Sequence, residues 1–147
     1  MIFEKCIKVR SFFSILPRDW QESILPLWED YKSSTECFVL NEANEIVAGG
    51  LVFTKCPPDM LYVKHEADFW FEAGYKYLGF IYVSESRRGQ NLGSYWLNSL
   101  KEMYPETKFW LTIEDLNLHH FYVKNGFLYV KTLHHGEQKE GLYLYPN

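Results

Sequence analysis

The chain has 147 residues, of which 47% are hydrophobic and 18% aromatic, and its formal net charge is −4 at pH 7. This length fits a single domain over residues 1–147, and the apolar content excludes a disordered chain because it suffices to form a core. The basic residues are scattered and no apolar stretch could span a bilayer, so we expect neither a nucleic-acid nor a membrane partner.

The N-terminal part of the chain predicts one strand and a broken helical region. Loose alternation of apolar residues over positions 2–9 predicts a strand. Pro17, which is followed closely by an acidic residue, predicts the start of a helix. Pro26 falls inside the helical pattern that follows, so we expect two short helices or a kink there.

The middle of the chain predicts a hairpin followed by an ambiguous segment. Strands are expected over positions 37–40 and 46–53, on either side of a polar turn. Gly49 and Gly50 interrupt the second strand and predict a bulge or a close backbone approach. The segment 60–75 mixes acidic and aromatic residues, and it predicts either a helix or an irregular flap.

The remainder of the chain alternates strands with helices and closes with a hairpin. Aromatic and β-branched runs predict strands over residues 77–83, 109–113, 127–133 and 142–145. Helical patterns cover residues 92–103 and 114–124, and Asn125-Gly126 ends the second of them. The strand-helix-strand order implies a locally parallel pair of strands and an α/β fold.

A turn rich in glycine and arginine joins the strand over 77–83 to the next helix. The unpaired amides at the start of a helix, together with its dipole, suit a phosphate group. Gly89 and Gly93 carry no side chain that would hold a phosphate away, while Arg87 and Arg88 add positive charge. The alternative is an ordinary turn with surface arginines.

The segment VSESRRGQNLGS over residues 83–94 resembles the coenzyme A signature of the GCN5-related N-acetyltransferases, the GNAT family. That signature is Arg or Gln, two residues, Gly, one residue, and then Gly or Ala. Arg88 stands first and Gly93 last, whereas Asn91 replaces the usual middle glycine and can adopt a positive φ. The resemblance implies a mixed, twisted sheet of six to seven strands with helices on both faces. It also implies that the cofactor lies in a splay between the two central parallel strands.

The resemblance further implies which residues hold acetyl-coenzyme A, the expected co-substrate. Amides of the 88–94 loop would bind the pyrophosphate, and strand residues would bind the pantetheine arm. At the start of the last helix, Asp115 stands where the family often has Asn, so Asn117 replaces it or no residue does. The expected cofactor-binding residues are Ile81, Tyr82, Val83, Arg88, Gly89, Gln90, Asn91, Leu92, Gly93, Ser94 and Asn117.

A second segment, FYVKNGF over residues 121–127, resembles the last helix of the same family. Tyr122 falls on the family's frequent general acid, which protonates the departing thiolate. A phenol of pKa about 10 can donate to a thiolate whose conjugate acid has a pKa of about 8.5. The alternative is that Tyr122 and its aromatic neighbours are packing residues.

An amine acceptor must lose a proton before it attacks, so a general base is expected. We expect Glu66 or Glu85 in this role, among five candidates. These candidates are His65, Glu66, Asp68, Glu72 and Glu85. The alternative is that these side chains form a solvated face, although as a group they would also attract a cationic substrate.

Cysteine and histidine patterns predict no disulfide framework and no metal site. The three cysteines are far apart and include no Cys-x-x-Cys pair. His119 and His120 lack the His-x-x-x-His spacing of a metal-binding helix and point about 100° apart. A reducing cytoplasm is the expected location, also because the first residues lack the apolar run of a signal peptide.

The sequence therefore predicts an N-acetyltransferase that moves an acetyl group directly from acetyl-coenzyme A to an amine, either a small molecule or a peptide. One alternative is a non-catalytic acyl-coenzyme-A-binding or sensor domain of the same fold, and another is a structural α/β domain without a nucleotide. The identity of the acceptor stays open. Either a monomer or a homodimer is expected; a homodimer could form if an exposed C-terminal strand paired across two chains.

Overall fold

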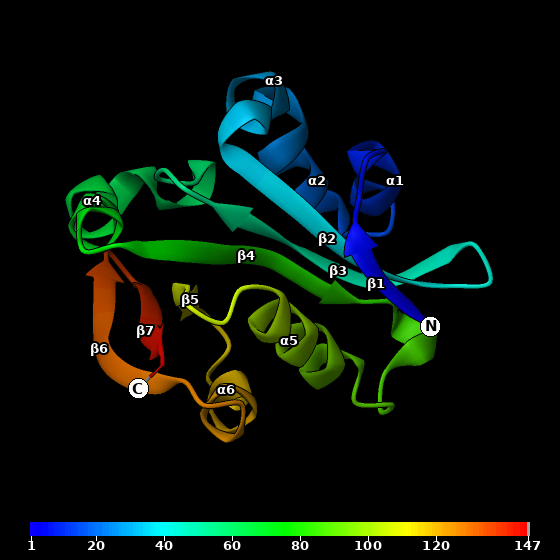
Figure 1. Cartoon of the computed structure of the whole chain (residues 1–147). Coiled ribbons are helices and arrows are strands. Elements are labelled where there is room, and N and C mark those ends of the chain that lie inside the picture. The colour runs from blue at the N-terminus through cyan, green and yellow to red at the C-terminus, as the bar shows by residue number, and fades with distance from the viewer. Residues whose placement is uncertain (147) are drawn as a thin grey trace.

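The computed structural model describes residues 1–146, and these contain one seven-stranded sheet of order β1-β2-β3-β4-β5-β7-β6 (Figure 1). The strands are β1 (Ile2–Lys5), β2 (Thr35–Glu42), β3 (Glu45–Phe53), β4 (Tyr75–Val83), β5 (Lys108–Ile113), β6 (Leu128–His135) and β7 (Gln138–Tyr145). β4 and β5 are parallel, and the other neighbouring strands are antiparallel. This mixed sheet confirms the expected fold class. Asn147, the last residue of the expected domain, lies outside the described residues, and the single domain stays a prediction.

Helices cover both faces of the sheet, as expected. One face carries α1 (Val9–Phe13), α2 (Arg18–Ile24), α3 (Trp28–Tyr31) and α4 (Lys64–Glu72). The other carries α5 (Leu92–Met103) and α6 (His119–Lys124), and Figure 1 shows α1–α3 and α5–α6 on opposite sides. Short 3₁₀ turns complete the chain: η1 (Leu25–Leu27), η2 (Lys32–Ser34), η3 (Pro58–Val63), η4 (Glu85–Arg87) and η5 (Leu116–Leu118).

Two separate hydrophobic cores lie on the two faces, because successive strand side chains point to opposite sides. Tyr77 and Trp110 pack into the core beneath α1–α4, which we call the upper core. Leu78 and Leu111, one position further along the same strands, pack into the core beneath α5 and α6, which we call the lower core. The core into which a side chain of β4 or β5 packs therefore shows on which face of the sheet that side chain lies.

Three expected elements differ from the structure or were left open by the sequence. The strand expected over 2–9 ends at Lys5, and the chain then forms α1, whose Phe12 and Phe13 are buried in the upper core. The ambiguous segment 60–75 is helical, formed by η3 and α4. The break at Pro26 is confirmed, since η1 separates α2 from α3 there.

The paired glycines of β3 lie at a register shift against β4, as expected for a bulge. A Cβ atom on Gly49 would lie 2.6 Å from the Phe12 ring, and one on Gly50 would lie 2.7 Å from the Trp96 ring. The Phe12 ring of the upper core and the Trp96 ring of the lower core therefore pack directly against the backbone of these two glycines. A methyl group at either position would cost about 1–3 kcal/mol of folding free energy through overpacking.

A second feature of this bulge lies in β4, where Phe80 has a φ of +55°. The extra residue carries Phe80 to the upper core, where its ring meets Trp20 at 6.0 Å between centroids. Bulges bend a strand and increase its twist. Residues 75–77 of β4 pair with residues 108–110 of β5, and beyond them the two strands have no further pairs among the described residues. The parallel strands therefore splay apart.

Candidate active site

A cavity of about 680 Å³ lies between the splayed end of β4 and the start of α5. Of the expected cofactor-binding residues, those that line this cavity are Ile81, Tyr82, Val83, Arg88, Gly89, Asn91, Leu92, Gly93 and Ser94. Gln90 and Asn117 do not line it. Gln90 accepts a hydrogen bond from Arg87 Nε, and the Asn117 amide bonds the side chain of Asp115, which caps η5.

The loop before α5 turns sharply at two positions with left-handed backbone. Gly89 has a φ of +80°, and Asn91, the N-cap of the twelve-residue helix α5, has a φ of +60°. Asn91 therefore supplies the geometry that the replaced glycine of the signature would give. A Cβ atom on Gly89 would have no neighbour within 4 Å, so an open space lies beside the loop. This geometry fits a phosphate-binding helix start.

Gly93 lines the cavity, and its missing side chain also makes room for packing between helices. A Cβ atom there would lie 2.9 Å from Cζ of Phe121 on α6. The buried Asn125 strengthens this junction, since its Nδ2 donates to Ser94 Oγ at 3.1 Å and to the Phe121 carbonyl oxygen at 2.8 Å. α6 is thereby fixed against the start of α5.

Three basic side chains line this first cavity. Arg87 pairs with Glu42 at 3.0 Å, which ties the loop to the β2–β3 hairpin. The Nε of Arg88 donates to the Val83 carbonyl oxygen at 3.2 Å, and its guanidinium lies 5.2 Å from the Tyr82 ring centre. Lys124 on α6 is the third, and the sequence reasoning missed it. The positive charge and the helix start together suit an anionic ligand such as a pyrophosphate.

A second cavity, of about 430 Å³, opens beyond the splay and is lined by five carboxylates. These are Asp19 of α2, Asp59 of η3, Glu114 and Asp115 just after β5, and Glu140 of β7. None of its described lining residues is Lys, Arg or His. None of the five carboxylates forms a salt bridge within residues 1–146. The cavity therefore attracts cations.

Three of these carboxylates influence one another. Burial, and then the charge of Glu114, raise the pKa of Asp59 to about 6, although more than a third of this residue stays accessible to water through the open cavity. Glu140 is 7% exposed, and burial raises its pKa despite the hydrogen bond that Tyr62 donates to it. Negative charge is thus concentrated on one wall without a cation to neutralise it.

The two cavities are contiguous, because they share four lining residues: Trp20, Ile81, Leu118 and Tyr122. Tyr122 belongs to the lower core, whereas Glu140 bonds Tyr62 beside the upper core. The splay between β4 and β5 therefore forms a passage through the sheet. One end of this passage is basic and the other is acidic.

Tyr122 lies at the junction of the two cavities and is 6% exposed. Burial raises its pKa, so the hydroxyl stays protonated at neutral pH. No hydrogen bond within residues 1–146 engages this hydroxyl, which leaves it free to donate to a ligand in the passage. This placement suits the general acid expected from the sequence.

The expected bases lie elsewhere. Glu66 of α4 is turned toward β6, where its carboxylate pairs with Lys131 at 2.5 Å and accepts from Trp70 Nε1 at 3.3 Å. Glu85 is exposed in η4 and lines neither cavity. The other candidates, His65, Asp68 and Glu72, are likewise outside the lining residues. The structure therefore does not bring Glu66 or Glu85 to the passage.

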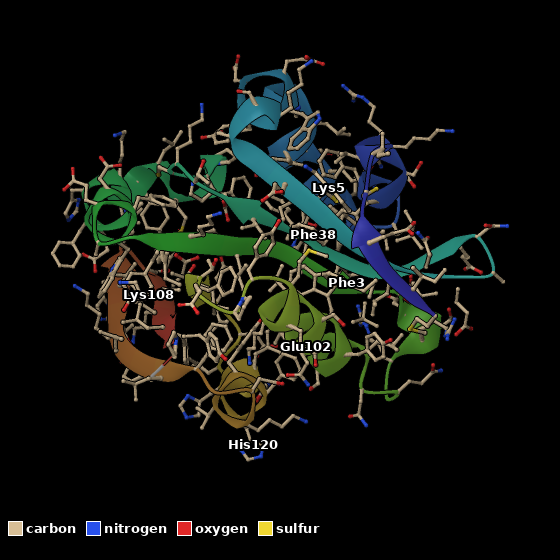
Figure 2. All side chains as sticks on the ribbon, in the orientation of Figure 1. Phe3, Lys5, Phe38, Glu102, Lys108 and His120 are labelled. Atoms are coloured by element: carbon tan, nitrogen blue, oxygen red, sulfur yellow. The ribbon has the colours of Figure 1, made fainter. Side chains whose placement is uncertain are left out.

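A signal for the carboxylates that do line the passage was present in the sequence. Glu114 and Asp115 follow directly after β5, and ligands of α/β sheets bind beyond the carboxyl ends of parallel strands. The sequence reasoning had assigned this pair to the start of a helix. By contrast, His119 and His120 are both exposed, and Figure 2 shows His120 pointing outward from α6.

Two classes of site are not found in the described part of the chain. Residues 1–146 contain no group of three or more His, Cys, Asp or Glu side chains that could hold a metal ion. Among the same residues, no helix is both long and apolar enough to cross a bilayer.

Several solved structures share this fold, at identities below 25%. An aminoglycoside 6'-N-acetyltransferase complexed with coenzyme A has a TM-score of 0.71 and 14% identity, covering 98% of this chain and 96% of the other. The aminoglycoside 6'-N-acetyltransferase of Enterococcus faecium has a TM-score of 0.70 and 13% identity, with the same coverages. An acetyltransferase from Thermus thermophilus has a TM-score of 0.62 and 20% identity, covering 94% and 83%.

The sequence itself was also compared with protein families and with curated proteins. No curated protein matches it significantly. A family model described as "Acetyltransferase (GNAT) family" matches residues 8–127, a span that includes the β4–α5 loop, the splayed strands and Tyr122. The chain therefore belongs to the GNAT acetyltransferase family.

Proposed function

We propose that the protein is an N-acetyltransferase that moves an acetyl group from acetyl-coenzyme A to an amine by direct transfer. One observation carries the proposal: a basic cavity and an acidic cavity meet at a buried tyrosine hydroxyl. The basic cavity suits the phosphates of the donor, and the acidic cavity suits a protonated amine. The same fold occurs in an aminoglycoside N-acetyltransferase complexed with coenzyme A.

The residues that line the basic cavity fit acetyl-coenzyme A. The α5 start and the Gly89 loop offer backbone amides to the pyrophosphate, with Arg88 and Lys124 at hand. Within residues 1–146, the edge of β4 that turns away from β3 has no strand partner beyond residue 77. Its peptide groups near Ile81 and Val83 can therefore pair with the amides of the pantetheine arm.

In the reaction the lone pair of the neutral amine attacks the thioester carbonyl carbon. A C–N bond forms, the C–S bond breaks, and the acetyl group passes to nitrogen without a covalent enzyme intermediate. Tyr122 donates its hydroxyl proton to the departing sulfur, and the nitrogen loses its proton to a base. Exchange with water then restores both residues.

We assign the base role to Asp59 in place of Glu66 and Glu85. Asp59 lines the acidic cavity, and a base is most effective when its pKa lies near the working pH. Its pKa of about 6 leaves it mostly ionised at neutral pH and still able to accept a proton, directly or through water. A reducing compartment such as the cytoplasm fits the three free cysteines, and a monomer or homodimer stays a prediction.

The experiment that tests this function separates catalysis from binding alone. Calorimetry with acetyl-coenzyme A measures binding, and a thiol reagent measures release of coenzyme A in the presence of a panel of primary amines. We expect binding and amine-dependent release. Tight binding without release for any amine of the panel would favour the sensor domain, and absence of binding would contradict both.

A further inference from the structure

We propose that the acceptor is a small molecule with at least two ammonium groups, one of which is acetylated while the other stays charged against the wall formed by Glu114 and Glu140. This deepens the proposed function, on which it rests, by naming the substrate class. Charge, the position of Tyr122 and the size of the cavity each support it.

The charge of the acidic cavity exceeds what a single reacting amine can neutralise. Its five carboxylates have no basic partner among the described residues. The reacting nitrogen must be neutral when it attacks, so at that moment it cancels none of this charge. A second ammonium group would remain protonated and would offset the repulsion on the wall, where burial, and then the charges of Glu114 and Asp59, raise the pKa of Glu140.

The position of Tyr122 provides an independent argument. Its hydroxyl is nearly buried, has no hydrogen-bond partner within residues 1–146, and lies at the junction of the two cavities. The reacting end of the acceptor must therefore reach this junction from the acidic side. The Glu140 carboxylate, which Tyr62 fixes, lies beside the upper core, whereas Tyr122 lies in the lower core. An acceptor that reaches both must carry charge at a distance from its reacting nitrogen.

The size of the cavity favours a small molecule over a peptide chain. Its volume of about 430 Å³ lies within the range typical of small-ligand pockets. Side chains from several elements line it, among them Trp20 of α2, Asp59 of η3, Tyr77 of β4 and Glu140 of β7. A linear or cyclic polyamine of modest length satisfies this volume and the charge.

The probes are 1,4-diaminobutane and 4-aminobutan-1-ol, which have similar length and differ by one ammonium group. Affinity for the protein saturated with coenzyme A is measured by calorimetry, and kcat/KM is measured by coenzyme A release. We expect the diamine to bind about tenfold more tightly or better, because hydrogen bonds between charged groups are the strong ones. Added salt should reduce this preference.

Variants locate the preference in the structure. Glu140→Gln and Glu114→Gln keep the side-chain shape but remove charge, and each should reduce the diamine preference several-fold. Glu72→Gln is the matched control, because Glu72 is an exposed acid on α4 outside both cavities. Thermal unfolding of each variant checks that it is folded. If a carboxylate variant does not fold, the salt dependence of the preference in the unaltered protein decides.

The outcomes separate this inference from the proposed function. Equal affinity and equal kcat/KM for the two probes would overturn the inference while leaving acetyl transfer intact. Preferential binding of the diamine without turnover would overturn the inference that one of its ammonium groups is acetylated, and it would also contradict the enzyme. Preference for a lysine-rich pentapeptide over every diamine of three to eight carbons would overturn the small-molecule class.

Discussion

At the scale of single residues, Tyr122 offers the clearest test of the mechanism. Tyr122→Phe keeps the ring that packs against Phe127 and Tyr143 and removes the hydroxyl alone. We expect kcat to fall by roughly 10²- to 10⁴-fold, the loss typical of a positioned general acid. Affinity for acetyl-coenzyme A and the melting temperature should stay nearly unchanged. Unaltered kcat in this variant would make Tyr122 a packing residue.

Asp59 predicts the pH dependence of the reaction. If it is the base, kcat/KM should rise with pH through about 6, as its carboxyl group loses its proton. The groups around it are Glu114, Glu140, Tyr62 and Tyr77, and burial raises the pKa of Glu140 as well. In Asp59→Asn, kcat/KM should be lower, and its rise with pH through about 6 should be lost. If kcat/KM of this variant still rose with pH at the same midpoint, another residue would be the base.

The same carboxyl group makes a prediction about stability. Its pKa is raised from 3.8 to about 6 on folding, so the folded state binds its proton more tightly than the unfolded state does. The contribution of Asp59 to stability therefore declines as the pH rises through this interval. Asp59→Asn should raise the melting temperature near pH 8 and change it little near pH 4. Scanning calorimetry at both pH values tests the sign.

At the scale of elements, two variants of the loop before α5 compare the contributions of its backbone amides and of the Arg88 side chain to coenzyme A binding. Gly89→Ala meets no neighbouring atom but forces a residue with a Cβ into a φ of +80°, which costs on the order of 1 kcal/mol and reorients the loop amides. Arg88→Ala leaves the backbone intact. Since exposed charge is screened by salt and helix-start amides are fixed, we expect Gly89→Ala to weaken coenzyme A binding more.

Calorimetry at low and at moderate ionic strength distinguishes the two variants. Arg88→Ala should reduce affinity modestly and flatten its dependence on salt, whereas Gly89→Ala should reduce affinity at every salt concentration. Asn98→Ala, an exposed change on α5 away from the loop, serves as the control. Complete loss of binding in a folded Arg88→Ala protein would reverse this ranking.

Elements with a local signal were predictable from the sequence, and β4 shows where such signals fail. Its aromatic and β-branched residues predicted the strand, and Gly49-Gly50 predicted an irregularity in its neighbour. The bulge placed Phe80, which is not a glycine, at a positive φ, and this reversed the alternation of its side chains. At this bulge Phe80 packs against Trp20 and Phe53, which are both distant from it in the sequence.

At the scale of the whole molecule, the basic half of the site was predictable because its residues are contiguous in the chain. A motif of a dozen residues, 83–94, supplies eight of the sixteen residues that line the basic cavity. The acidic half comes from α2, η3, the end of β5 and β7, which meet only when the sheet forms. Glu66 and Glu85 were predicted as the general base because Glu66 is near other acidic residues in the sequence and Glu85 is near the end of a strand. Neither position carried information about the face on which its side chain would lie.

For the proposed acetyl transfer, the passage through the sheet also has a consequence for the order in which the two ligands bind. The basic cavity and the acidic cavity share four lining residues, Trp20, Ile81, Leu118 and Tyr122, and the rest of each lining belongs to one cavity alone. We expect binding in either order and a ternary complex before transfer. Initial rates should give intersecting reciprocal plots, and free coenzyme A should compete with acetyl-coenzyme A but not with the amine. A compulsory order, with either ligand required first, would mean that one entrance closes during the cycle.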